Sequence, residues 1–177
     1  MKGGVLLLLS AIISMTNQQN SEAAKAASVP AHVSNSFHFV IRAPLSRAAP
    51  LFGPEGERCW AGRQWNPVFV YPQPGQDVPG AVFTVQHGPQ TSVWVNTLFD
   101  PEGGRMQYVS FVPGIHVFTV DVRLTPVDSS STSVEVTYAR TALNVGANDE
   151  VQTLGNLDRE SGPHWQQAIE NCLAAQR

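Results

Sequence analysis

The chain has 177 residues, of which 42% are hydrophobic and 14% charged, and its formal net charge is −3. This length suits a single domain that buries a sufficient apolar core without metal or disulfide support. Lys and Arg residues form no cluster or basic stripe along the chain. Binding to a phosphate backbone needs such a concentration of positive charge, so we expect no nucleic-acid partner.

The first 27 residues differ in composition from the rest of the chain. Lys2 precedes an apolar run from Val5 to Met15, which is shorter than the stretch of about 20 residues that crosses a membrane. Ala24-Lys25-Ala26 supplies an A-x-A cleavage site, so residues 1–27 are typical of a signal peptide. The alternatives are an anchoring or disordered N-terminus, or a true start at Met15. We expect a periplasmic or secreted protein if the signal is real and a cytoplasmic one otherwise.

The folded part is expected to begin with a strand and two short helices. Apolar and polar residues alternate over residues 36–42, as they do on a half-buried strand. Residues 44–49 begin with a proline, which suits the first turn of a helix, and Pro54 starts a second helical turn that reaches about Trp60. Glu57 lies in the first turn of this second helix, where its charge complements the helix dipole.

A series of short strands follows, separated by turns rich in proline, glycine and aspartate. Six further strands are predicted over residues 68–71, 81–87, 92–99, 106–112, 115–125 and 133–143. Connections this short force neighbouring strands to run antiparallel, because a parallel pair needs a crossover of a dozen residues or more. The sheet is therefore predicted to be a meander, and residues 36–177 to form one domain after a linker at residues 28–35.

An amphipathic helical stretch ends the chain. Its apolar residues recur three and four positions apart, which places them roughly on one helix face; they are Val151, Leu154, Trp165, Ile169, Cys172 and Leu173. Gly162-Pro163 interrupts the stretch, and the ring of Pro163 would clash with the carbonyl group of Arg159. We expect a kink or a break there.

The order of these elements resembles the helix-grip fold of the START/Bet v 1-like superfamily, also called SRPBCC or polyketide cyclase/dehydrase-like proteins. Pro54–Trp60, Trp65–Pro67 and Val70–Pro72 look like the segment after the first strand in many bacterial members. Val136–Leu143 looks like their last strand, and the resemblance extends from about Phe37 to the C-terminus. It implies an α+β fold, in which a seven-stranded, curved antiparallel sheet carries two short helices and packs a C-terminal helix on its concave face.

The two cysteines, Cys59 and Cys172, have a spacing that fits no zinc site. Two buried apolar thiols are the commoner arrangement for such a pair, whereas an exported protein can hold one disulfide. In the helix-grip fold the short helices form a cradle under the end of the C-terminal helix. The resemblance therefore implies that the two residues lie close together, and that they bond in an exported form if their Cα atoms come within about 7 Å.

The resemblance also implies the function: a pocket between sheet and helix that binds a hydrophobic or amphipathic small molecule, such as a lipid, a polyketide-like compound or an aromatic one. We expect a monomer with no cofactor, no transmembrane span in the mature domain and no metal, since the five histidines share neither a helix face nor a close spacing. No motif names a reaction. The alternatives are a cyclase- or dehydratase-like enzyme, without a redox cofactor, that uses a pocket His or Tyr as acid or base, and an interaction module of the chaperone-activator kind.

Six residues are candidates for contact with the ligand, although each also suits an ordinary core position: Trp94, Asn96, Tyr108, His116, Tyr138 and Trp165. The Tyr and Trp side chains carry polar groups that seek a partner when buried. The histidine shares its strand face with apolar residues and would serve as a general base or as a contact for a polar ligand group. The asparagine amide lies among apolar neighbours and must find hydrogen bonds. Arg140 either reaches inward to a carboxylate or extends to water at the sheet edge.

Overall fold

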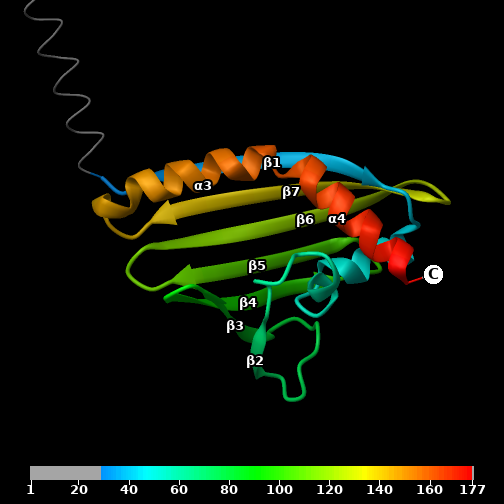
Figure 1. Cartoon of the computed structure of the whole chain (residues 1–177), viewed down its shortest axis with the longest axis horizontal. Coiled ribbons are helices and arrows are strands. Elements are labelled where there is room, and N and C mark those ends of the chain that lie inside the picture. Colours follow the sequence, from blue (N-terminus) through cyan, green and yellow to red (C-terminus); the bar gives the residue numbers. More distant parts are fainter. Residues whose placement is uncertain (1–28, 177) are drawn as a thin grey trace, which may run out of the picture.

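A seven-stranded antiparallel sheet dominates the computed structural model, which describes residues 29–176 (Figure 1). The predicted signal peptide lies outside the described residues. The strands are β1 (His32–Ile41), β2 (Val68–Tyr71), β3 (Val82–His87), β4 (Gln90–Asp100), β5 (Arg105–Val112), β6 (His116–Asp128) and β7 (Ser131–Ala142). Their order in the sheet is β1-β7-β6-β5-β4-β3-β2, so β2 to β7 form the predicted meander and β1 pairs with β7 at one edge.

Alternation along the strands separates the buried concave face of the sheet from its solvated face. On β6 the buried side chains are the alternate residues His116, Phe118, Val120, Val122 and Leu124. This period of two follows from the pleat, which points successive side chains to opposite faces. Apolar residues on the inner face therefore make one continuous core under the covering helices.

Strand β1 begins at His32, earlier than the predicted start at residue 36, so much of the expected linker belongs to the sheet. The reason is a contact that is distant in sequence. The Asn35 side-chain amide donates to the carbonyl oxygen of Gly155 at 2.8 Å, and a Cβ atom on Gly155 would lie 2.8 Å from Val33. A C-terminal helix therefore lies so close to this half of β1 that only glycine fits at the contact.

The segment between β1 and β2 contains α2 (Leu45–Ala48), η1 (Ala49–Phe52) and η2 (Gly56–Cys59), the last two being 3₁₀ turns. The α-helix ends at Ala48, within the predicted range of 44–49, but a 3₁₀ turn that the sequence did not predict follows it directly. Pro50 lies in the first turn of η1, where its missing N–H breaks no helical hydrogen bond. Burial of Leu51 and Phe52 holds the additional turn against the core.

The C-terminal helical stretch is broken in two, as Gly162-Pro163 predicted. After the short turn η3 (Val145–Ala147), α3 (Asn148–Glu160) runs along β1 and β7, whereas α4 (Gly162–Ala175) takes a different direction toward the short helices (Figure 1). Val151, Ile169, Cys172 and Leu173 of the predicted apolar face are buried. Two helices, rather than one, therefore cover the sheet.

A buried ion pair fastens α3 to β7. Arg140 Nε and Nη2 donate to the Asp158 carboxylate at 2.6 and 2.7 Å, and both side chains are about 9% exposed. The guanidinium carbon also lies 4.3 Å from the centre of the Phe118 ring and 4.8 Å from that of Tyr138. Of the two alternatives for Arg140, the inward position facing a carboxylate is the one observed.

Replacement Asp158→Ala should lower the free energy of unfolding by about 3–5 kcal/mol, because it leaves the Arg140 charge buried without its partner. Chemical denaturation measures this loss. The control is Arg123→Ala, which breaks the exposed Arg123–Asp121 pair and should cost no more than about 1 kcal/mol. Equal losses in the two variants would show that the buried pair is not a structural anchor.

Candidate ligand-binding site

A cavity of about 390 Å³ lies between the concave face of the sheet, the short helices and α4. We call it the main cavity. Strands β4 to β7 contribute one wall, η2 and the loop after it a second, and α4 a third. Its walls include six aromatic residues: Trp60, Trp65, Trp94, Tyr108, Tyr138 and Trp165. The side chains on the concave face of the sheet therefore do not fill the space between the sheet and the helices.

The aromatic rings around the main cavity pack against one another. The ring centres of Trp60 and Trp165 are 4.8 Å apart, and those of Tyr138 and Trp165 are 6.4 Å apart. On the sheet side Trp65 meets Trp94 edge to face at 5.4 Å. Such arrangements are the preferred ones for aromatic pairs, so the rings support each other and hold the wall in place.

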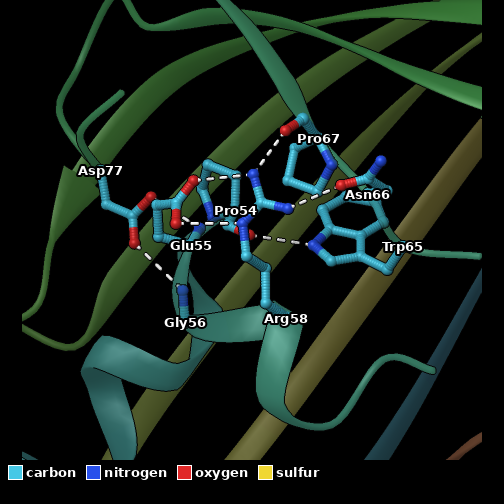
Figure 2. Close-up of polar contacts among 8 residues, drawn as sticks. All are labelled: Pro54, Glu55, Gly56, Arg58, Trp65, Asn66, Pro67 and Asp77. Atoms are coloured by element: carbon cyan, nitrogen blue, oxygen red, sulfur yellow. Dashed lines mark hydrogen bonds and ion pairs between the residues drawn. The ribbon is translucent and has the colours of Figure 1, made fainter. Parts of the chain in front are cut away.

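A polar network fixes the segment that carries Trp65 (Figure 2). The guanidinium group of Arg58 forms an ion pair with Glu55 at 3.0 Å, and also donates to Asn66 Oδ1 at 2.9 Å and to the carbonyl oxygen of Pro67. One arginine therefore connects η2 to the start of β2 and holds together the two ends of the loop that carries Trp65.

Hydrogen bonds to backbone groups complete this support. Trp65 Nε1 donates to the carbonyl oxygen of Pro54 at 3.0 Å, and Trp60 Nε1 to that of Leu51 at 2.7 Å. The carboxylate of Asp77 accepts from the backbone N–H groups of the two residues after Pro54 (Figure 2). Both tryptophan rings are thus attached to the short helices by their polar atoms, and their apolar surfaces remain available to the cavity.

A disulfide joins Cys59 of η2 to Cys172 of α4, with 5.7 Å between the two Cα atoms. The proximity implied by the resemblance is confirmed. Cys59 adjoins Trp60, while α4 contributes Trp165 and Ala168 to the opposite wall. The bond therefore connects two walls of the main cavity.

Glu57 lines the main cavity. Its position in the first turn of a helix had suggested only that its charge complements the helix dipole. Its carboxyl group makes no hydrogen bond or ion pair within residues 29–176. Burial, with a further contribution from the charge of Asp77, raises the pKa of this carboxyl well above 4.5. The sequence did hold a signal, because Glu57 precedes Trp60 by three residues and so shares its side of a helical turn.

The two tyrosines of the main cavity have different environments. The Tyr108 hydroxyl donates to the carbonyl oxygen of Phe52 and so holds η1 against β5. The Tyr138 hydroxyl has no hydrogen-bond partner in the described part of the chain. Burial raises the pKa of both phenols, and the nearby charge of Glu57 raises both further. Tyr138 and Glu57 therefore present two unpaired polar groups to one apolar space.

A second cavity of about 330 Å³ adjoins the first, since Trp65, Trp94 and Tyr138 line both. His116 lies in its wall, buried, and Nδ1 has no hydrogen bond among residues 29–176. That atom is 3.8 Å from a carboxylate oxygen of Glu150. Burial, and then the charge of Arg140, lowers the pKa of His116, so the neutral imidazole is favoured.

The structure brings together most of the residues that the sequence put forward as ligand contacts. Trp94, Tyr108, Tyr138 and Trp165 line the main cavity, and His116 lines the second one. Asn96 is in neither wall: it is fully buried on β4, and its amide atoms have no hydrogen-bond partner within residues 29–176. Contact of these residues with a ligand stays a prediction.

From residue 29 to 176, no three His, Cys, Asp or Glu side chains come together as ligands for a metal ion. No helix in this part of the chain is long and apolar enough to span a membrane.

Solved structures share this fold. Norcoclaurine synthase from Thalictrum flavum matches 85% of this chain and 91% of its own length, with a TM-score of 0.61 and 10% sequence identity. Ara h 8.0201 matches 81% of this chain and 99% of its own length (TM-score 0.58, 15% identity). A conserved protein from Geobacillus kaustophilus matches 81% and 97% (TM-score 0.59, 15% identity).

No family model and no curated protein matches the chain by sequence. The likeness at such low identity is one of fold, and it confirms the resemblance at that level: the protein has the α+β helix-grip fold of the Bet v 1-like superfamily.

Removal of the disulfide should destabilise the protein. The bond spans 113 positions, and the chain-entropy model gives roughly 4–5 kcal/mol as an upper estimate for a loop of that size. We expect the double variant Cys59→Ser/Cys172→Ser to lose up to this amount in urea denaturation. A reducing agent should lower the stability of the wild-type protein similarly and leave the variant unchanged. A variant as stable as the oxidised protein would contradict this account.

Glu57 should make stability depend on pH. A carboxyl with a raised pKa binds its proton more tightly in the folded state, so its contribution is full below about pH 4.5 and is lost as pH rises toward the folded pKa. The loss is at most about 1.4 kcal/mol per pH unit. The stability of Glu57→Gln relative to wild type should therefore increase with pH over this window, as measured by denaturation at several pH values. A difference that is constant with pH would refute the assignment.

Proposed function

We propose that the protein binds a hydrophobic or amphipathic small molecule, with an aromatic or other apolar body, in the main cavity. The observation that carries the proposal is the space of about 390 Å³ whose walls include six aromatic residues. Small-molecule sites are typically clefts of about 300–1,000 Å³, lined by apolar side chains with a few placed polar groups. The main cavity has this size and this composition.

The energetics of such a site follow from its walls. Transfer of apolar ligand surface out of water contributes about 25 cal/mol per Å², and the flat rings of the walls suit an aromatic partner. Glu57 and Tyr138 are the polar groups that would set the orientation of the ligand. A longer ligand that continues into the second cavity would meet His116 and Arg140 there.

Norcoclaurine synthase from Thalictrum flavum, which shares the fold, has been solved in complex with dopamine and hydroxybenzaldehyde. Both compounds are aromatic, which supports an aromatic ligand for this chain. An interaction module of the chaperone-activator kind is less well supported. Such a protein is expected to have a filled core, whereas this one has two cavities between sheet and helices.

Acid–base catalysis is the second candidate, and it rests on Glu57 and Tyr138. A carboxyl group with a raised pKa and an unpaired phenol that face one apolar cavity are the groups from which general acids and bases are built. In this alternative the protein is an enzyme of the cyclase or dehydratase type. The sequence put forward a pocket His or Tyr as the acid or base; Tyr138 is such a residue, and Glu57 is an addition to them.

Filling the main cavity should abolish binding. Ala168 of α4 lines the cavity, so Ala168→Trp introduces a large side chain into the ligand space. The neutral dye N-phenyl-1-naphthylamine should bind the wild type with a rise in fluorescence and bind this variant at least about tenfold more weakly, since an indole displaces the ligand and its buried area. Ala174→Trp, exposed on the same helix, is the matched control. Equal affinities in the two variants would place the ligand elsewhere.

The two candidate functions differ in the fate of the ligand. A compound that co-purifies with the protein can be extracted, returned to fresh protein and followed by mass spectrometry. A binding protein returns it unchanged, whereas an acid–base enzyme converts it, and Glu57→Gln abolishes the conversion.

A further inference from the structure

We propose that the main cavity selects organic cations, that is, an ammonium or quaternary ammonium group carried on an apolar or aromatic body. Glu57 is the counter-ion and the surrounding rings stabilise the positive charge. The inference rests on the proposed function, because it names the class of ligand for the same cavity.

The first support is the uneven charge of the cavity wall. Glu57 contributes the carboxyl group, and the wall contains no Lys or Arg side chain. The neighbouring Arg58 is engaged with Glu55, Asn66 and Pro67 in the network of Figure 2. Arg140 lines the second cavity instead, and there it is already paired with Asp158. The carboxyl of Glu57 therefore faces the cavity without a Lys or Arg partner, and His164 is the one residue of the wall that can become a cation.

The second support is the set of aromatic rings around the same space. The faces of Trp and Tyr rings carry a negative partial charge, and they attract a cation most strongly where it has been removed from water. Cages of such rings are a known means of recognising quaternary ammonium groups. The rings of Trp60 and Trp165 are in contact at 4.8 Å; Trp60 follows Glu57 and Cys59 of η2 directly, and Trp165 comes from α4, which carries Cys172. A carboxyl group and a cluster of rings therefore line the same cavity.

The third support is the state of the carboxyl group without a ligand. A carboxylate that is partly removed from water and has no partner is unfavourable, and the raised pKa of Glu57 means that it keeps its proton to a higher pH than usual. The charged or titratable groups around it are Asp77 from the loop after β2, Tyr108 from β5, Tyr138 from β7 and His164 from α4.

Neither tyrosine is a cation, and the charge of Asp77 favours protonation of Glu57. An entering organic cation would displace this proton into water. Glu57 and its partner are then together neutral both before and after binding, because the cation takes the place of one proton. Cation affinity is therefore expected to rise with pH until Glu57 is ionised, whereas the affinity of a neutral ligand stays constant.

The test compares two ligands of the same shape. Benzyltrimethylammonium carries a quaternary nitrogen, and neopentylbenzene has a carbon atom in its place. Both are measured by competition with N-phenyl-1-naphthylamine on the wild-type protein and on Glu57→Gln. We expect the replacement to weaken cation binding at least about tenfold, because the ligand charge loses its counter-ion in a site that is partly removed from water. Binding of the neutral compound should change less than about twofold.

Two further measurements make the test specific. Glu135→Gln, a change of the same charge at an exposed position on β7, should leave both affinities unchanged. Titration calorimetry in two buffers of different ionisation enthalpy should detect proton release when the cation binds to the wild type, and none with Glu57→Gln.

The outcomes separate this inference from the proposed function. If the dye and the neutral compound bind but the cation does not, or if Glu57→Gln weakens both compounds equally, the cation preference is wrong and the hydrophobic site stands. If neither the dye nor either compound binds to the wild type, the proposed function itself fails. Dye affinity retained by Glu57→Gln shows that the variant is folded.

Discussion

The change of helix direction at Gly162-Pro163 is the constraint on which the site depends. Before it, α3 is held on β1 and β7 by close contact at Gly155 and by the buried Arg140–Asp158 pair. After it, α4 still contacts the C-terminal part of β1, where Gln166 Nε2 donates to the carbonyl oxygen of Val40 at 2.9 Å, and it reaches η2, to which Cys172 is bonded. A single straight helix would pack along β1 and β7 and would leave the rest of the concave face uncovered. The break therefore encloses the main cavity, and the disulfide holds the enclosure together.

The inner wall contains polar groups that stability alone does not require. Arg140 and Asp158 balance each other, and Tyr108 is bonded to the backbone of η1. Glu57, Tyr138 and His116, by contrast, face the two cavities without a hydrogen bond within residues 29–176. His116 is buried, and a buried polar atom without a partner costs stability; Glu57 and Tyr138 are half-buried. Titratable groups with shifted pKa values gather at functional sites. Their position between large aromatic rings is what connects the helix-grip fold to ligand binding in this chain.

Much of the fold could be predicted because its signals are local. Alternating apolar residues define strands and their buried faces, short turns make neighbouring strands antiparallel, and proline excludes a continuous helix at residue 163. The known order of elements in the helix-grip fold then placed Cys59 beside Cys172 and several aromatic residues around one space. The differences from the prediction occur where a distant segment decides the outcome: α3 extends β1 back to His32, and burial of Phe52 adds the turn η1 after the first helix.

The sequence by itself determined the strands, their antiparallel order, the break before α4 and the aromatic content of the interior, because each follows from spacing between neighbouring residues. Tertiary structure alone decided that Glu57 lines the main cavity, that Asn96 lies outside both cavities and that Arg140 meets Asp158. The physical reason is that burial and pKa depend on what surrounds a side chain. Around Glu57 those surroundings come from β5, β7 and α4, which begin 48 or more residues away in sequence and are assembled only by folding.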